Sequence, residues 1–248
     1  MNGLRVALGF LTTLPVRAPE PYRPGDLGRA AAWYPLVGLV LGAILGLAAL
    51  LLRVLLPAPV AAVVLVSLWA LLTGGLHLDG LADCGDGLLA AVPRERRLEI
   101  MRDPRLGTFG GMSLALHLLL KTALLSTLLS ATNTDSLLAA LLVAPVWARW
   151  LILWVARQPM ARPGGLGAEF ALGLSWRAYG YAALVPLALL GLNPWRVLAA
   201  ALLAHLVMAA VVWLARSRLG GVTGDVLGLV IELGEVFALL AFVALSFQ

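Results

Sequence analysis

Charged residues are scarce in this chain. Asp, Glu, Lys and Arg make up only 12% of its 248 residues, while 61% of the residues are hydrophobic. Soluble domains carry about 25% charged residues, so this chain has too few of them to cover a globular surface in water. The composition therefore excludes a soluble globular domain and predicts an integral membrane protein.

Cysteine and lysine are almost absent. Cys84 is the single cysteine, so disulfides contribute nothing to the fold. Lys121 is the single lysine, and arginine therefore carries the net charge of +5. In a membrane protein an excess of arginine first describes topology, so it does not predict binding of nucleic acid.

The N-terminal segment also lacks the small-residue cleavage site that is typical of a signal peptide. Residues 1–17 hold only a short apolar patch. We interpret residues 4–14 as a helix that lies at the membrane interface.

Long apolar runs are what the chain has in abundance. A membrane-spanning helix needs about 20 mainly apolar residues. We therefore expect an all-α fold, one integral membrane domain over residues 1–248, with about seven spanning helices (roughly six to eight) and short interfacial helices. The expected spans are 33–56, 59–78, 112–131, 137–156, 179–192, 197–215 and 226–247. Gly38, Gly42 and Gly46 share one helix face and predict close packing between the first two spans.

Arginine is distributed unevenly among the connections between these spans. Only Arg53 and Arg196 fall on one side. The positive-inside rule places the arginine-rich side in the cytoplasm, with the N-terminus inside and the C-terminus outside. That side carries Arg5, Arg17, Arg23, Arg29, Arg94, Arg96, Arg97, Arg102, Arg105, Arg157, Arg162, Arg177, Arg216 and Arg218.

Three carboxylates follow the second expected span, at i, i+4 and i+7. At about 100° per residue, Asp79, Asp83 and Asp86 lie on one side of a helix. Carboxylates that share a face repel each other, and a divalent cation with a preference for oxygen ligands, Mg²⁺ or Mn²⁺, removes that conflict. The alternative is a solvated acidic helix end that is balanced by the arginines after it.

Residues 79–111 form the longest cytoplasmic connection, and we expect it to be the main catalytic one. Arg102 and Arg105 lie beside a glycine-rich loop whose backbone N–H groups could hold phosphate oxygens. Two further basic, glycine-rich connections contain Arg162 and the pair Thr223 and Asp225. Three such loops on the side of the aspartates predict a shared site for a phosphorylated substrate. The alternative is contact between arginines and lipid headgroups.

Four charged residues fall inside the expected spans, where each costs at least about 2.5 kcal/mol at the bilayer centre. We expect Glu232 and Glu235 to face inward or to pair with Lys121 or Arg149. A structural ion pair and a functional site remain alternatives for these four residues.

The three histidines are expected to have ordinary roles. His77 is interpreted as a helix cap or a headgroup contact. His117 and His205 are isolated in apolar spans, and we interpret them as core residues rather than ligands.

Several of these motifs resemble those of the cobalamin-5′-phosphate synthase family. Its members are adenosylcobinamide-GDP ribazoletransferases of bacterial and archaeal membranes. The resemblance is carried by FLTTLP at 10–15, HLDGLADCGDG at 77–87, RERRLEIMRDPRLGTFG at 94–110 and GGVTGDVLG at 220–228.

The resemblance implies a transferase that joins α-ribazole, or its 5′-phosphate, to adenosylcobinamide-GDP with release of GMP, which completes the nucleotide loop of cobalamin. It implies a Mg²⁺ cofactor, with Mn²⁺ as an alternative, held by catalytic aspartates, of which Asp86 is a candidate base. It also implies an inner-membrane protein of a prokaryote, in contact with lipid, with homo-oligomers left open. The implied site residues are Asp79, Asp83 and Asp86 for metal and catalysis, and Arg102, Arg105, Arg162, Thr223 and Asp225 for substrate phosphates.

Two other functions remain to be weighed. A CDP-alcohol phosphotransferase of lipid synthesis also uses aspartates at a helix end, but its pattern has arginine after the alanine, where this chain has Asp83 after Ala82. A cation-coupled transporter could use a path made of Asp225, Glu232, Glu235 and Lys121, although no inverted repeat is visible.

Overall fold

The computed structural model describes residues 2–17 and 23–246, and in this part of the chain every regular element is a helix. The predicted all-α fold is thereby confirmed. The helices are α1 (Asn2–Leu11), α2 (Asp26–Ala30), the 3₁₀ turn η1 (Ala31–Trp33), α3 (Tyr34–Leu55), α4 (Ala58–Thr73), α5 (Leu76–Leu89), α6 (Arg94–Ile100), α7 (Thr108–Ser130), α8 (Thr134–Val155), α9 (Gly165–Gly173), α10 (Trp176–Leu189), α11 (Pro194–Leu219) and α12 (Gly224–Ala244).

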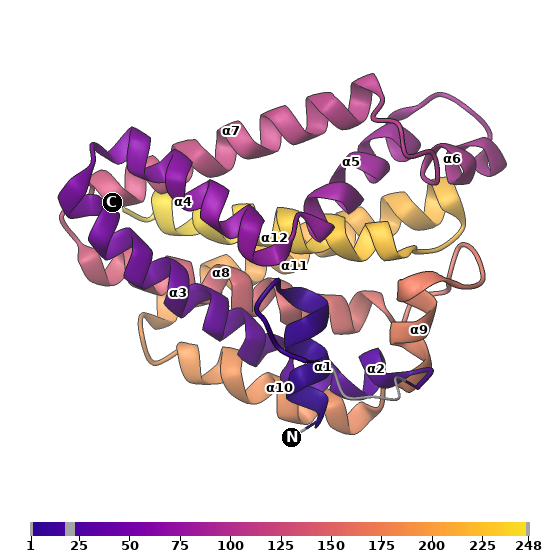
Figure 1. The fold of residues 1–248 in the computed structure, drawn as a ribbon, viewed down its shortest axis with the longest axis horizontal. Coiled ribbons are helices and arrows are strands. Elements are labelled where there is room, and N and C mark those ends of the chain that lie inside the picture. The colour runs from indigo at the N-terminus through magenta and orange to yellow at the C-terminus, as the bar shows by residue number, and fades with distance from the viewer. Residues whose placement is uncertain (1, 18–22, 247–248) are drawn as a thin grey trace.

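Two helices form the centre of the bundle. The most apolar stretches of α12 and α8 are 83% and 78% buried, whereas those of α7 and α11 are only 33% and 28% buried. Figure 1 shows α12 crossing the middle of the molecule between α7 and α8. The outer helices expose large apolar side chains, among them Leu47, Leu119 and Trp213. Such a surface suits lipid rather than water.

Within the described residues, five helical segments are long and apolar enough to cross a membrane, or up to six if α4 and α5 together count as one bent span. The sequence predicted about seven. One difference is the expected span 179–192, which is α10 and has only 14 residues. At 1.5 Å per residue it is about 21 Å long, short of a hydrocarbon core of about 30 Å.

The other difference is the expected span 59–78, which is not continuous. It ends at Thr73, and α5 leaves α4 at an angle of 94°. Gly74 and Gly75 form the turn in the left-handed region, with φ values of 64° and 70°. Glycine adopts this conformation without a steric penalty, so two successive glycines end α4 and redirect the chain. The aspartates therefore lie on a separate helix.

The small-residue face of α3 packs against α8. A Cβ atom on Gly38 would lie 2.5 Å from the carbonyl oxygen of Pro145, and one on Gly42 would lie 2.5 Å from that of Leu141. These distances require glycine at both positions. The predicted close packing is confirmed, but the predicted partner, the second span, was wrong. The spacing of glycines identifies the face and not the helix that covers it.

Gly42→Ala is therefore expected to lower the free energy of unfolding of the protein in detergent by about 1–3 kcal/mol, and with it the melting temperature, because the added methyl group forces α3 away from α8. Gly180→Ala on α10 is the matched control, since a Cβ there meets open space. The control should be neutral or slightly stabilising, because alanine favours a helix over glycine. Equal melting temperatures for the two variants would contradict the close contact.

The basic connections meet at one end of the bundle. Arg94 donates to the carbonyl oxygen of Ala161 at 3.1 Å, and Arg218 donates to that of Leu88. Arg53 lies at the opposite end, where it donates to the carbonyl oxygen of Ala131 at 2.6 Å. The charge asymmetry that the sequence indicated is thus an asymmetry between two ends of the folded molecule.

A buried ionic cluster joins α7, α8 and α12. The Lys121 ammonium lies 2.6 Å from a Glu235 oxygen and 3.0 Å from a Glu232 oxygen. Arg149 donates to the other Glu235 oxygen, and His117 Nε2 lies 2.8 Å from Glu232. All five side chains are buried. The predicted pairing of the two glutamates with Lys121 or Arg149 is confirmed, and both cations take part.

Candidate functional site

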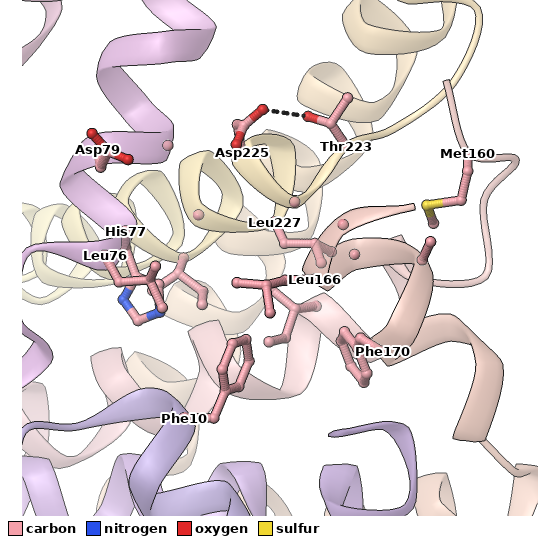
Figure 2. Close-up of a pocket in the computed structure, with 18 of the residues that line it drawn as sticks. Phe10, Leu76, His77, Asp79, Met160, Leu166, Phe170, Thr223, Asp225 and Leu227 are labelled. Carbon is pink, nitrogen blue, oxygen red and sulfur yellow. Dashed lines mark hydrogen bonds between the residues drawn. The ribbon is translucent and has the colours of Figure 1, made fainter. Parts of the chain in front are cut away.

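A pocket of about 210 Å³ lies between α1, α5, α9 and the start of α12. Four of the eight residues that the sequence assigned to a site line it, although they come from three separate parts of the chain. Figure 2 shows Asp79, Thr223 and Asp225 along one side of this pocket. The fourth is Arg162, from the connection after α8.

Close packing of α5 on α12 brings the acids of both helices together. A Cβ on Gly80 would lie 2.8 Å from the carbonyl oxygen of Asp225, and one on Gly228 would lie 3.2 Å from that of His77. Only glycine permits so short a separation. The glycines within the two motifs therefore set the distance between Asp79 and Asp225.

Asp225 is held in place by its neighbours. Thr223 donates to Asp225 Oδ2 at 3.1 Å, and Arg162 donates to the same oxygen at 3.3 Å. The Thr223 hydroxyl also accepts a bond from the backbone N–H of Val226 and so caps α12. The helix N-terminus and Arg162 both favour a negative charge at this point.

The site carries an excess of negative charge. Asp83 lies one turn beyond Asp79 on α5, and Asp225, Asp79 and Asp86 all act on it electrostatically. Arg162 is the cation that counters them. Four carboxylates and one guanidinium leave the region short of positive charge, which a bound cation would supply.

Asp86 caps the N-terminus of α7. Its Oδ2 accepts the backbone N–H of Gly107 and its Oδ1 accepts that of Gly110, both at 2.8 Å. The carboxylate thus ties the loop before α7 to α5. In the described residues no three His, Cys, Asp or Glu side chains form a group that could hold a metal ion. The three aspartates share α5, but they are not arranged as a ready-made metal site.

Asp86→Ala is expected to destabilise the first turn of α7 by about 0.5–2 kcal/mol, because two backbone N–H groups lose their acceptor. Hydrogen exchange should quicken at Gly107 and Gly110. Asn133→Ala is the matched control, because Asn133 caps α8 by accepting the N–H of Ser136. That variant should quicken exchange at Ser136 only. Unchanged exchange at Gly110 in Asp86→Ala would contradict the cap.

Arg102 and Arg105 lie on the loop between α6 and α7, outside the residues that line the pocket. The Arg105 side chain is 86% exposed and forms bonds of 2.9 and 2.6 Å to Asp103. These bonds from Arg105 hold the pKa of Asp103 at about 2. Both arginines can meet only a substrate that extends beyond the pocket, and their predicted role stays a prediction.

His77 is a pocket residue that the sequence interpretation missed. It is 3% exposed and lines the pocket, so the predicted cap or headgroup contact was wrong. The turn at Gly74 and Gly75 directs the start of α5 against α12, which buries the ring. Phe10 of α1 and Phe170 of α9 also line the pocket. Phe10 falls in the run at 10–15 and His77 in the motif at 77–87. These two motifs were therefore the signal in the sequence from which the pocket residues could have been found.

Two glycine-rich connections are joined at the edge of the pocket. Met160 and Val222 form an isolated parallel bridge. The backbone N–H of Ala161 donates to the Val222 carbonyl oxygen, and the Val222 N–H donates to that of Pro159, both at 2.9 Å. The connection that carries Arg162 is thereby fixed to the one that carries Thr223.

This fold and this site define a class: a helical integral membrane protein with a carboxylate- and arginine-lined pocket at one end of its bundle. Within that class, the chain belongs to the cobalamin-5-phosphate synthase family, whose profile matches residues 3–243. The family resemblance of the sequence motifs is confirmed.

Curated relatives match over nearly the whole chain. A protein of Pseudomonas putida strain F1, named adenosylcobinamide-GDP ribazoletransferase, is 43% identical over 95% of both chains. Proteins of the same name from Desulfitobacterium hafniense and Thiobacillus denitrificans are 39% and 41% identical over 97% of this chain, and over 96% and 94% of their own lengths. No solved structure matches the chain.

Proposed function

We propose that this protein is an adenosylcobinamide-GDP ribazoletransferase. It joins α-ribazole, or the 5′-phosphate of α-ribazole, to adenosylcobinamide-GDP and releases GMP. The observation that carries the proposal is the 43% identity over 95% of both chains to a relative of that name. The pocket supports it, because the acids and Arg162 that line it are suited to a diphosphate and its counter-ion.

The reaction exchanges one phosphorus–oxygen bond for another. A ribose hydroxyl of the nucleoside attacks the phosphorus next to cobinamide, and the bond from this phosphorus to the GMP oxygen breaks. The hydroxyl proton passes to a carboxylate of the cluster. Both oxygens of Asp86 already accept backbone N–H groups. This makes Asp86 a weaker candidate for the base than the sequence suggested, and Asp79, Asp83 and Asp225 remain.

The donor set fits Mg²⁺, with Mn²⁺ as the alternative. Mg²⁺ usually keeps several waters and binds one or two protein carboxylates together with substrate phosphates, so it does not need three protein ligands in advance. Asp79, Asp83 and Asp225 would hold it, and the bound ion would neutralise charge on the diphosphate. Asp86 would serve chiefly to position the loop before α7.

Arginines would hold the phosphates from two directions. Arg162 lies in the pocket beside Asp225. Arg102 and Arg105 lie outside it, on the loop that Asp86 fixes to α5. A donor as large as adenosylcobinamide-GDP must extend beyond a pocket of about 210 Å³. The loop arginines would meet the extended part.

The pocket end would face the cytoplasm of a prokaryotic cell, from the inner membrane. Arginines of several connections gather at this end, and the positive-inside rule places such an end inside. The three relatives described above are bacterial proteins.

The test is an assay of purified protein in detergent or liposomes with adenosylcobinamide-GDP, α-ribazole and Mg²⁺. One GMP should be released for each corrinoid molecule that is joined to α-ribazole. Chelation with EDTA should stop the reaction, and Mg²⁺ or Mn²⁺ should restore it. A protein that releases no GMP here, but releases CMP from CDP-alcohols, would be the lipid-synthesis enzyme instead.

A further inference from the structure

The pocket has two chemically different ends. In Figure 2 the carboxylates of Asp79 and Asp225 lie on one side, and the rings of Phe10 and Phe170 lie on the other. Phosphates and a cation account for the acidic side. The apolar side has no role in the transfer as described so far.

The apolar side is a firmly packed wall. Phe170 is fully buried, and its ring centroid lies 5.2 Å from that of Tyr34, which in turn lies 6.0 Å from that of Phe10. Leu11, Ile152 and Ile231 add buried aliphatic surface. A wall of this kind favours a flat, apolar ligand.

One residue that lines this pocket has a buried polar atom without a partner. Nδ1 of His77 has no hydrogen bond to any described residue, although His77 is 3% exposed and lines the pocket. His205, by contrast, has its Nδ1 2.8 Å from the carbonyl oxygen of Ala201. Buried polar groups are nearly always paired, so the His77 nitrogen calls for a ligand that carries a hydrogen-bonding atom.

We propose that the apolar side binds the aromatic base of the acceptor nucleoside, and that His77 Nδ1–H donates a hydrogen bond to the free ring nitrogen of that base. The inference rests on the proposed function and names the part of the substrate that this pocket takes. A dimethylbenzimidazole nucleoside presents a flat, alkylated base with one unsubstituted ring nitrogen, which matches one donor among apolar walls.

The other substrate groups fit this side poorly. Guanine carries several donors and acceptors, which apolar walls would leave unpaired. A corrin ring is too large for a pocket of about 210 Å³. With the base beside His77 and Phe10, the ribose of the acceptor extends toward Asp79 and Asp225, where its hydroxyl meets the diphosphate.

The first test compares two acceptors, the benzimidazole nucleoside and its indole analogue, in which C–H replaces the free nitrogen. The wild-type enzyme should prefer the benzimidazole by about tenfold in kcat/KM. In His77→Phe the preference should fall to about one, because neither acceptor then finds a donor. His205→Phe is the control and should keep the tenfold preference.

The second test narrows the pocket without touching its polar side. Leu166 lies at the apolar side on α9 and is 50% exposed, so Leu166→Trp is expected to fold and to project into the pocket. It should raise the KM for α-ribazole at least about tenfold and leave the KM for adenosylcobinamide-GDP unchanged. Leu172→Trp is the control, on the same helix, 70% exposed and outside the pocket lining.

The outcomes separate the two proposals. Absence of GMP release by the wild-type enzyme would refute the proposed function. Normal release, with the base preference intact in His77→Phe and an unchanged KM for α-ribazole in Leu166→Trp, would refute only the base site and leave the pocket to a lipid chain. A rise in the KM for adenosylcobinamide-GDP alone would assign the pocket to the donor and would also overturn the inference.

Discussion

Asp83→Asn is expected to lower the rate of GMP release roughly a thousandfold, the scale associated with loss of a group that binds the catalytic ion or accepts the proton. The substitution keeps the shape of the side chain and removes one negative charge from a cluster of four carboxylates. Repulsion within the cluster therefore decreases, and the melting temperature of the substrate-free protein should stay the same or rise. Loss of activity without loss of stability distinguishes a functional carboxylate from a structural one.

The control for Asp83→Asn is Glu99→Gln on α6. Glu99 is exposed and, among the residues that the structure describes, pairs only with Arg96, three residues before it. Exposed pairs of this kind contribute little, so the control should keep both activity and melting temperature. Both variants would be compared with the wild type for kcat and for thermal unfolding in the same detergent. Turnover near the wild-type rate in Asp83→Asn would remove the basis for a metal site on α5.

Glu235→Gln is expected to have the largest effect on stability, a loss of roughly 3–5 kcal/mol. Glu235 is fully buried and is bonded to both Lys121 and Arg149. Removing its charge leaves two buried cations with one carboxylate, Glu232, and an uncompensated buried charge is strongly destabilising. The expected observation is a much lower melting temperature in detergent.

The double variant Glu235→Gln with Arg149→Met tests whether charge balance is the cause. It leaves Lys121 paired with Glu232 at 3.0 Å, so the cluster is neutral again. Much of the lost stability should return, and a double-mutant cycle measures the coupling. Glu99→Gln, at the exposed pair with Arg96, is again the control for an ordinary ion pair and should change stability little. A double variant less stable than Glu235→Gln would argue against charge balance.

Patterns within one segment were predictable from the sequence. The spacing of Asp79 and Asp83 follows from helix geometry alone, and apolar runs identified the long helices. Pairing of Glu232 and Glu235 with cations followed from the high cost of an isolated charge in a membrane. In each case the relevant physics acts over a few residues or depends on composition.

What the sequence did not reveal depends on contacts between distant segments. The glycine face of α3 was visible, but its partner α8 was not. Asp86 was grouped with its neighbours by spacing, yet the folded loop supplies two backbone donors that fix it as a cap. His77 is buried because of the turn at Gly74 and Gly75. The sequence shows two adjacent glycines there, but not the direction in which the chain turns.

The bridge between Met160 and Val222 has a consequence for protein engineering. Two loops that are far apart in the chain share backbone hydrogen bonds, so an engineered variant should exchange both loops together. A chimera that receives the loop with Arg162 from a relative, but keeps its own loop with Thr223, would have to re-form this pairing between mismatched halves. Transplanting both loops together preserves the register, and substrate preferences could then be exchanged between relatives as a single module.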